Sequence, residues 1–357
     1  MMKKLLCLLL STPIVASLSI AEEAKPASLG ALEFGPDGVL FAADPKGASV
    51  FALELGGGDA AGKAPVKIEK LGEKIAALLG AKADQISIND LAIDPKSAVA
   101  YLSVSRGLGA DATPVLVKAA AGELSVVDLG KLEASRLPLS NAPENKVTGE
   151  GRRKKNKRLE SITDLAWLDG RLAIAGLSNE EFASTLRVTD YPFTGAVGTT
   201  SLEIFHGAHG KEETHSPIRT FMPMDIGGEP NIIASYTCTP LVCIPLSKLK
   251  PETKVKGRTV AELGNRNRPL DMISYEKGGE RFILMANSSR GVMKVSTKDI
   301  ATIDSITQRV AGESAGLSYE TVEAWDGVVQ LAKVDDGHAA IIRSGDAGQS
   351  LEHVALP

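Results

Sequence analysis

The sequence has few aromatic residues and few cysteines, and it lacks the signatures of several enzyme classes. Phe, Trp and Tyr make up 4% of its 357 residues, which disfavours a surface that stacks nucleic-acid bases or sugar rings. It contains no Gly-x-Ser-x-Gly nucleophile elbow, no His-Glu-x-x-His zinc motif and no Cys-x-x-Cys-His haem site. With 43% hydrophobic and 24% charged residues, the composition is that of a globular protein with an aliphatic core. Whether it is an enzyme stays open at this level.

The first 21 residues have the features of a secretory signal peptide. Lys3 and Lys4 precede an apolar run that extends to Ile20, and Ser19 and Ala21 are the small residues expected before a cut after Ala21. The alternative is a membrane anchor, which the polar interruption at residues 11–13 disfavours. We therefore predict a secreted or periplasmic protein whose mature chain, residues 22–357, has no transmembrane segment.

The net charge and the cysteines fit an exported protein. The formal net charge is −4, and removal of two lysines with the signal makes it more negative, which disfavours a nucleic-acid partner. Cys238 and Cys243 are flanked by two apolar runs that are typical of adjacent strands. In an oxidising compartment we expect a disulfide between them. The alternative use of this pair is a soft-metal or redox site.

Short apolar runs, separated by Asp-Gly, Gly-Gly and Pro-Lys turns, recur along the chain, whereas only Leu71–Leu79 has a notable helical pattern. Six of these runs resemble one another, and each is followed by two further apolar strands and usually by a more polar fourth. They begin at Leu29, Ile88, Ile162, Met222, Pro269 and Tyr319. Their spacing of roughly 50 to 75 residues fits four-stranded blades with insertions between them.

This repeat predicts an all-β fold, a single β-propeller of six four-stranded blades over residues 22–357. The alternatives are a seven-bladed propeller, with a degenerate blade in residues 106–161, and a pair of β-sandwiches. The last run, Ser350–Leu356, is expected to close the ring either within the sixth unit or against residues 22–28.

In its blade rhythm the mature chain resembles secreted and periplasmic propellers of the NHL-like and lactonase-like kinds. The resemblance is architectural and rests on no motif specific to one family. It implies a propeller fold and says little about function, because propellers serve many unrelated functions.

An acidic residue recurs in the six aligned inner runs. Four aspartates share one position, with Glu320 close to it in the sixth unit and Ala31 in the first; the four are Asp90, Asp164, Asp225 and Asp271. Because the inner strands of a propeller surround a central channel, we expect these carboxylates at one mouth of that channel. Such hard oxygen ligands suit Ca²⁺. The alternative is that each Asp accepts backbone N–H bonds of the neighbouring blade.

Three of the five histidines lie within ten residues, at His206, His209 and His215, with Glu212 and Glu213 between them. Imidazole is a common ligand of Zn²⁺ and Cu²⁺, so this segment is a second candidate metal site. The spacing matches no established zinc signature. The alternative is an exposed polar loop with solvated histidines.

Two further groups of basic residues are candidates for binding. Arg106, Arg268 and Arg290 occupy predicted loops of one face, where guanidinium groups suit the carboxylate or phosphate of a small polar or anionic ligand. The tract Arg152–Arg158 has six charges in seven residues and is expected to be extended and solvated. It is a candidate contact for a protein partner or an anionic surface.

Together these features favour an exported binding or scaffold propeller that holds a cation, Ca²⁺ or Zn²⁺, or a small polar ligand at the channel mouth. One alternative is a metal-dependent hydrolase of lactonase or esterase type, in which a cation polarises a carbonyl or activates water. The other is a non-catalytic subunit of a periplasmic assembly.

Overall fold

The computed structural model describes residues 23–56, 67–168, 170–195, 197–312 and 314–357. The predicted signal peptide lies outside these residues. In the described part of the chain, no helix has the length and apolar character needed to cross a membrane.

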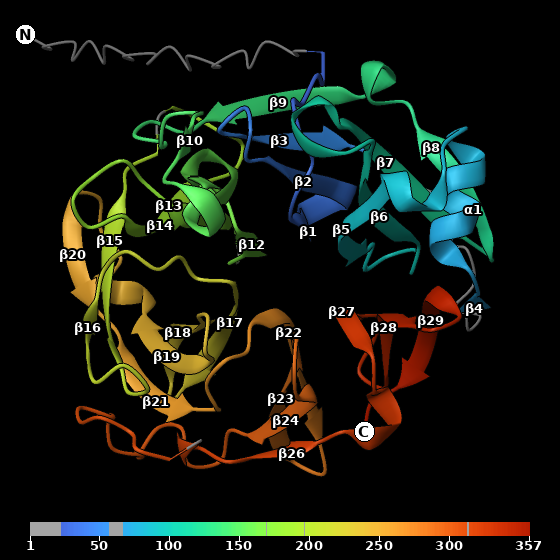
Figure 1. Cartoon of the computed structure of the whole chain (residues 1–357). Helices are drawn as coiled ribbons and strands as arrows, with labels where there is room; N and C mark the ends of the chain where they lie inside the picture. The colour runs from blue at the N-terminus through green and yellow to red at the C-terminus, as the bar shows by residue number, and fades with distance from the viewer. Residues whose placement is uncertain (1–22, 57–66, 169, 196, 313) are drawn as a thin grey trace, which may run out of the picture.

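Six antiparallel sheets are arranged as blades around a central axis, as predicted (Figure 1). The first blade contains β1 (Leu32–Phe34), β2 (Val39–Asp44), β3 (Ser49–Glu54) and β9 (Glu133–Pro138). The second contains β5 (Ile86–Ile93), β6 (Ala100–Arg106), β7 (Thr113–Ala120) and β8 (Glu123–Val127). The third contains β12 (Asp164–Trp167), β13 (Arg171–Leu177), β14 (Ser184–Asp190) and β15 (Thr200–His206).

The other three blades follow the same pattern, with the inner strand first. The fourth contains β17 (Thr220–Ile226), β18 (Glu229–Ser235), β19 (Pro240–Pro245) and β21 (Arg258–Glu262). The fifth contains β22 (Pro269–Lys277), β23 (Glu280–Asn287), β24 (Gly291–Ser296) and β26 (Tyr319–Thr321). The sixth contains β27 (Val328–Lys333), β28 (His338–Gly345), β29 (Gly348–Ala355) and β4 (Lys67–Ile68).

Short elements extend the blades. β15 also pairs with β16 (Lys211–Glu213) and, in parallel, with β20 (Thr253–Lys256), while β25 (Ala315–Gly316) lies beside β21. β10 (Val147–Thr148) and β11 (Lys155–Asn156) form a separate hairpin. The predicted helix is present as α1 (Leu71–Leu78), which buries Leu71, Ile75 and Ala76.

The blades do not follow one another around the ring in chain order. The inner strand β1 contacts β5 of the second blade on one side and β12 of the third blade on the other. β5 in turn contacts β27 of the sixth blade. The spatial order is therefore first, third, fourth, fifth, sixth, second, and back to the first.

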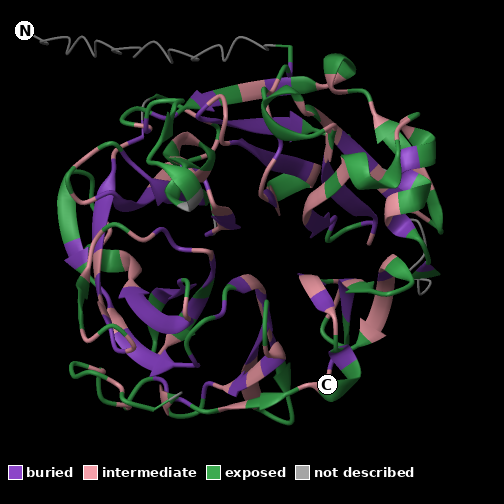
Figure 2. Cartoon of the chain, in the orientation of Figure 1, coloured by how far each residue is buried: buried purple, intermediate pink, exposed green. Residues whose placement is uncertain are grey.

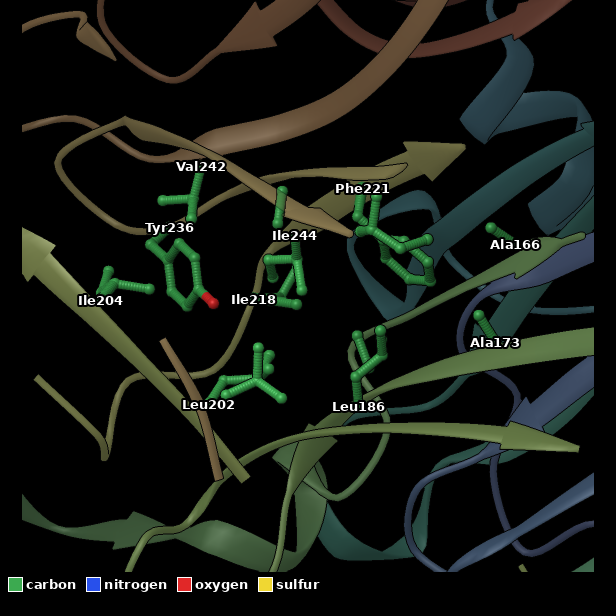
Figure 3. Close-up of a cluster of buried hydrophobic side chains, with 14 of the residues drawn as sticks. Ala166, Ala173, Leu186, Leu202, Ile204, Ile218, Phe221, Tyr236, Val242 and Ile244 are labelled. Atoms are coloured by element: carbon green, nitrogen blue, oxygen red, sulfur yellow. The ribbon is translucent and has the colours of Figure 1, made fainter. Parts of the chain in front are cut away.

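The hydrophobic core consists of six clusters, one between each pair of blades that are neighbours in this order. Phe41 of the first blade packs with Ile174 of the third, whereas Ile68 of the sixth packs with Leu102 of the second. Buried residues accordingly concentrate in the strands (Figure 2). In the cluster between the third and fourth blades, Tyr236 and Phe221 lie among aliphatic side chains (Figure 3). Alanine and branched aliphatic side chains fill these interfaces, as the low aromatic content predicts.

Two outer strands come from distant parts of the sequence. β29 pairs with β28 in its own blade and with β4, where Leu351 lies opposite Ile68. The last strand thus closes the ring within the sixth blade, and its further partner is β4, not residues 22–28. β9, which follows the second blade in the chain, pairs with β3 and completes the first blade.

One predicted inner strand was wrong, and the seven-bladed alternative is excluded. Tyr319–Thr321 is the outermost strand of the fifth blade, paired with β24, and the inner strand of the sixth blade is β27. Residues 106–161 contain no seventh blade, because they supply β7, β8, β9 and the β10–β11 hairpin.

Candidate functional site

Three of the four predicted aspartates lie together around the axis. Asp90, Asp164 and Asp271, here called the aspartate ring, occupy equivalent positions on the inner strands of the second, third and fifth blades. In the spatial order of the blades these are every second blade. The equivalent positions of the intervening blades hold Ala31, Thr220 and Gln330, and all six residues line one cavity of about 570 Å³, the channel cavity.

Each carboxylate of the ring connects two inner strands. Asp164 accepts the N–H of Leu165 in its own strand at 2.8 Å and that of Phe221 in the fourth blade at 2.8 Å. Asp271 does the same with Met272 and Leu331, both at 2.7 Å. Asp90 accepts the N–H of Leu32 at 2.7 Å. The predicted alternative role, acceptance of N–H bonds from the neighbouring blade, is thus present in all three.

Local strand geometry turns these side chains toward the axis. The pairing of β5 with β6 has a register shift between Ile88 and Asp90, and that of β22 with β23 has one between Pro269 and Asp271. A β-bulge changes the direction of the side chain that follows it. The bulges therefore give Asp90 and Asp271 their place on the channel wall.

The environment of the ring favours the uncharged form of its acids. Burial, and then the charges of its ring neighbours, raise the pKa of Asp90 well above its usual range. Burial and the charge of Asp271 likewise raise the pKa of Asp164, and burial raises the pKa of Asp271 to about 7 despite its two N–H donors. The ring is therefore prone to hold protons near neutral pH, or to attract a cation in their place.

A fourth acid, Glu33, lies on the other side of the ring. It lines a second cavity of about 400 Å³ together with all three ring aspartates, and its Oε1 accepts the N–H of Trp167 at 2.9 Å. Burial raises the pKa of Glu33 to about 7, and the charge of Asp271 adds to the effect. Glu33 was not predicted, because it lies two residues beyond the equivalent position Ala31.

Asp225 and Glu320 do not belong to the ring. Asp225 lies near the opposite end of β17, where it accepts the N–H of Gly228 at 2.9 Å and lines a separate cavity of about 880 Å³. The ring position of this blade is Thr220, five residues earlier. Glu320 lies in the outermost strand β26, opposite Lys294.

Two arginines line the channel cavity, and no other described cation does so. Nη1 of Arg219 lies 2.8 Å from Oε1 of Glu160. Arg268 forms no ion pair or side-chain hydrogen bond with a described residue, and burial, followed by the charge of Arg219, lowers its pKa. Both arginines also line an adjoining cavity of about 710 Å³, the mouth cavity.

The insertion between β9 and β12 forms one wall of the mouth cavity. Asn145, Val147, Asn156 and Leu159 all line it, and Val147 and Leu159 are among the exposed large hydrophobic residues. The prediction that Arg152–Arg158 is extended was wrong, because this tract folds into a 3₁₀ turn, strand β11 and a second 3₁₀ turn. The Lys155–Glu160 ion pair and the contact of Arg158 with the Pro143 carbonyl stabilise the folded insertion.

The other two predicted arginines lie elsewhere. Arg106 is an exposed residue at the end of β6, and Arg290 donates from Nη2 to the carbonyl of Asn265 at 3.1 Å. Neither lines the channel cavity or the mouth cavity. Arg219, which the sequence analysis did not select, directly precedes Thr220 and would have been found with a correct alignment of the fourth unit.

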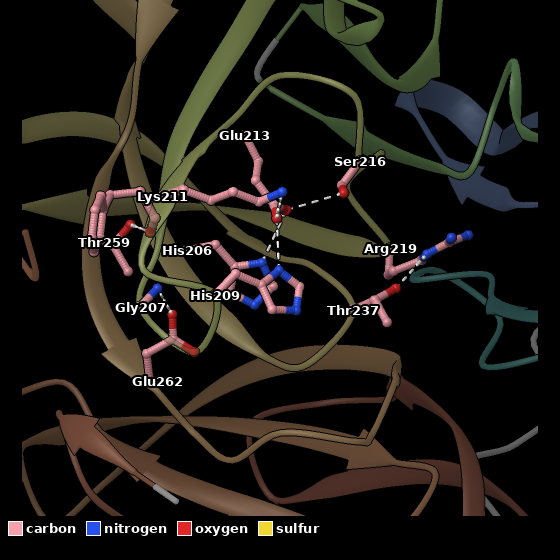
Figure 4. A network of polar contacts seen from close by, with 11 residues as sticks. His206, Gly207, His209, Lys211, Glu213, Ser216, Arg219, Thr237, Thr259 and Glu262 are labelled. Carbon is pink, nitrogen blue, oxygen red and sulfur yellow. Dashed lines mark hydrogen bonds and ion pairs between the residues drawn. The ribbon is translucent and has the colours of Figure 1, made fainter. Parts of the chain in front are cut away.

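A second polar group lies between the third and fourth blades (Figure 4). Nδ1 of His206 lies 3.0 Å from Oε2 of Glu213, and Nδ1 of His209 lies 2.6 Å from Oε1 of the same carboxylate. Burial would raise the pKa of Glu213, but the contacts with the two imidazoles outweigh it and lower the pKa to about 2. His206 is buried and the side chain of His209 is 45% exposed.

Cys238 completes this group, and His215 is not part of it. One ligand atom from each of His206, His209 and Cys238 lies within 4.8 Å of the others. His215 is exposed, and its Nδ1 contacts Thr214 Oγ1 at 2.8 Å. The role of these residues as metal ligands stays a prediction.

The predicted disulfide is absent, because Cys238 and Cys243 are both free. The flanking runs do form the β18–β19 hairpin, but Cys238 lies in its turn and Cys243 in the middle of β19. The residue opposite Cys243 is Ile233. Cys243 packs in the core between the fourth and fifth blades, where burial raises the pKa of its thiol to about 11.

The sequence matches no protein-family model and no curated protein. Similar solved structures include a glucose dehydrogenase, with 12% identity over 92% of this chain and 97% of that one and a TM-score of 0.34. Extracellular domains 1–2 of Drosophila Semaphorin 1b match with 10% identity over 95% of this chain and 87% of that one, with a TM-score of 0.39. The soluble aldose sugar dehydrogenase of Escherichia coli matches with 11% identity over 92% of this chain and 96% of that one, with a TM-score of 0.30. At such low identities and scores, these matches carry no conclusion about function.

Proposed function

We propose that this chain is a ligand-binding propeller that takes a small organic acid at the mouth of its axial channel. The observation that carries the proposal is the pair Arg219 and Arg268. Both line the channel cavity and the mouth cavity, but only Arg219 has an ion pair with a described residue, Glu160, which Lys155 also contacts. An anion placed between the two guanidinium groups relieves their repulsion.

The surroundings of the arginines suit the rest of such a ligand. The mouth cavity of about 710 Å³ and the channel cavity of about 570 Å³ are both in the size range of small-molecule sites. Val147 and Leu159 offer apolar contacts on one side. On the other side, the aspartate ring offers oxygen atoms to hydroxyl or amino groups. The expected ligand is therefore a small carboxylic acid that carries such groups, for example a hydroxy acid.

Calorimetric titration of the purified protein with acetate, lactate and succinate tests this proposal. At least one of the three acids should bind, and replacement Arg268→Ala should lower its affinity at least about tenfold, since it removes a charged hydrogen-bond partner. Arg106→Ala is the matched control, because Arg106 is exposed and lies outside both cavities, and should bind as wild type. Absence of binding by all three acids, or equal affinity in Arg268→Ala, would overturn the proposal.

A second candidate is a divalent cation at the aspartate ring, which the mutual repulsion of its three carboxylates favours. The two N–H bonds on Asp271 leave each of its oxygens with capacity for one further contact, as Ca²⁺ or Mg²⁺ requires. A titration with Ca²⁺ and with Mg²⁺ tests it, with Asp164→Asn expected to abolish binding. The hydrolase hypothesis needs this cation. If neither Ca²⁺ nor Mg²⁺ binds, the result contradicts both the cation site and the hydrolase.

We also propose that the protein is exported. The basic start, the apolar run and the residues Ser19 and Ala21 support this. N-terminal sequencing of the protein recovered from cells that express the full chain should find Glu22 first. Recovery of the intact N-terminus in the cytoplasmic fraction would contradict export.

A further inference from the structure

We propose that His206, His209 and Cys238 form a binding site for one Zn²⁺ ion, separate from the channel. His206 ends β15 in the third blade, His209 follows in the turn to β16, and Cys238 lies in the β18–β19 turn of the fourth blade. Two imidazole nitrogens and one thiolate are a ligand set that Zn²⁺ prefers. The site therefore joins two blades through a metal.

The two histidines share one carboxylate partner, as metal-binding histidines often do. Both Nδ1 atoms contact the single carboxylate of Glu213, which leaves Nε2 of each ring for an ion. A carboxylate on the far nitrogen of a histidine is the usual arrangement around zinc, since it fixes the tautomer and the ring orientation. The ring centroids of His206 and His209 are 3.9 Å apart, and one ring nitrogen of each histidine lies within 4.8 Å of the Cys238 sulfur.

Buried atoms without partners point to a missing ligand. His206 is 2% exposed, and its Nε2 has no hydrogen-bond partner among the described residues. The same holds for Oε2 of Glu262, whose other oxygen accepts the N–H of Gly207 in the histidine turn. A buried polar atom without a partner is costly, and a metal ion at Nε2 of His206 removes that cost.

The turn that carries Cys238 is held in an unusual conformation. Cys238 and Thr239 have φ values of 66° and 53°, a left-handed region that is unfavourable for residues other than glycine. The N–H of Cys238 donates to Asn267 at 2.9 Å and Thr239 Oγ1 donates to the Gly264 carbonyl at 2.8 Å. These contacts with the segment between β21 and β22 hold the turn that carries the thiol.

The three ligand atoms need only a small movement to bind an ion. They lie within 4.8 Å of one another, and the ligand atoms around tetrahedral Zn²⁺ are roughly 3.3 to 3.8 Å apart. A closure of about 1 to 1.5 Å is therefore enough. On binding, the Cys238 thiol loses its proton to solvent and its sulfur donates an electron pair to the ion.

The test uses the full protein, freed of metal by a chelator and titrated with Co²⁺, which reports thiolate ligation by a sulfur-to-cobalt absorption band in the near ultraviolet. We expect one equivalent to bind with this band and Zn²⁺ to displace it. Cys238→Ser should abolish the band, and His209→Ala should weaken binding at least about tenfold. Since His209 is exposed, His209→Ala tests the site even where Cys238→Ser fails to fold.

Control variants separate this site from other sites in the molecule. His215→Ala, in the same segment but outside the group, should bind Co²⁺ with this band as wild type does. Glu213→Gln should keep the band and lower the affinity about 10-fold to 100-fold, as expected of a positioning residue. Absence of the band in the wild-type protein, or its persistence in Cys238→Ser, would overturn the proposal.

Discussion

At the scale of single residues, backbone N–H bonds stabilise the charged acids along the axis, whereas burial and their mutual repulsion destabilise them. Glu33 shows this most simply, because its one described hydrogen bond uses only Oε1. A glutamine keeps that acceptor and removes the charge. The pKa of Glu33 is raised from its ordinary 4.5 to about 7 in the folded protein, so the folded state binds more protons than the unfolded state between these values.

The contribution of Glu33 to stability is therefore highest at low pH and is lost as the pH rises from about 4.5 to about 7. Glu33→Gln removes this loss. We expect the variant to match wild type near pH 4 and to exceed its free energy of unfolding by about 3 kcal/mol near pH 8. Urea unfolding at several pH values measures this. Glu54→Gln, at the exposed end of β3, is the control and should leave the pH dependence unchanged.

The ring aspartates also show what the sequence could predict about the site. Asp90, Asp164 and Asp271 were found because each precedes an apolar pair in an inner strand of regular pattern. Asp225 was misassigned because Met224-Asp225-Ile226 imitates that pattern at the other end of β17. Cys238 was assigned to a disulfide because a spacing of five residues does not reveal which residues of a hairpin lie opposite one another.

At the scale of elements, the ring aspartates connect inner strands that share no backbone ladder. Asp164→Ala leaves the N–H groups of Leu165 and Phe221 without their acceptor and should lower the free energy of unfolding by about 2 kcal/mol. The measurement belongs near pH 5, where repulsion within the ring is smallest. Asp225→Ala is the matched variant, because it removes only a turn contact, and a loss of comparable size there would contradict the role of the ring.

The strands themselves were predictable, because alternating apolar runs and turn residues are local signals. The outer strands were less so. β4 has only two residues, and β26 was mistaken for an inner strand because its sequence is followed by Trp325 and an Asp-Gly turn. The β10–β11 hairpin was hidden in a run of like charges, whose one described ion pair, Lys155–Glu160, no sequence pattern marks.

At the scale of the whole molecule, closure depends on β4. Ile68 is 1% exposed and packs in the cluster between the sixth and second blades. Ile68→Ala should lower the free energy of unfolding by about 2 to 4 kcal/mol and accelerate amide hydrogen exchange in β29. Its neighbour Lys67 has an exposed side chain, so Lys67→Ala should change stability by less than about 0.5 kcal/mol. Equal exchange in β29 of both variants would show that the ring closes without β4.

The exchanged order of the first two blades could not be read from the sequence, since no local pattern records which blades are neighbours. Only long-range contacts set it: β9 returns to the first blade and β4 reaches the sixth. In a propeller whose blades follow chain order, the ring would close at one place, where the first and last blades of the chain meet. Here the second blade lies between the first and the sixth, and its neighbours on both sides take an outer strand from the segments that flank it.

This arrangement has a consequence for synthesis on the ribosome. Ile68 emerges long before Leu351, its partner in the finished sheet, and the nascent chain must carry β4 without a partner until nearly the last residue is made. The edge of β3 is likewise open until β9 emerges. Unpaired strand edges are sites of aggregation. These edges are therefore all paired only when the chain is complete, and not as each blade is made. Export before folding would suit such a chain, since folding would then begin with all six blades available.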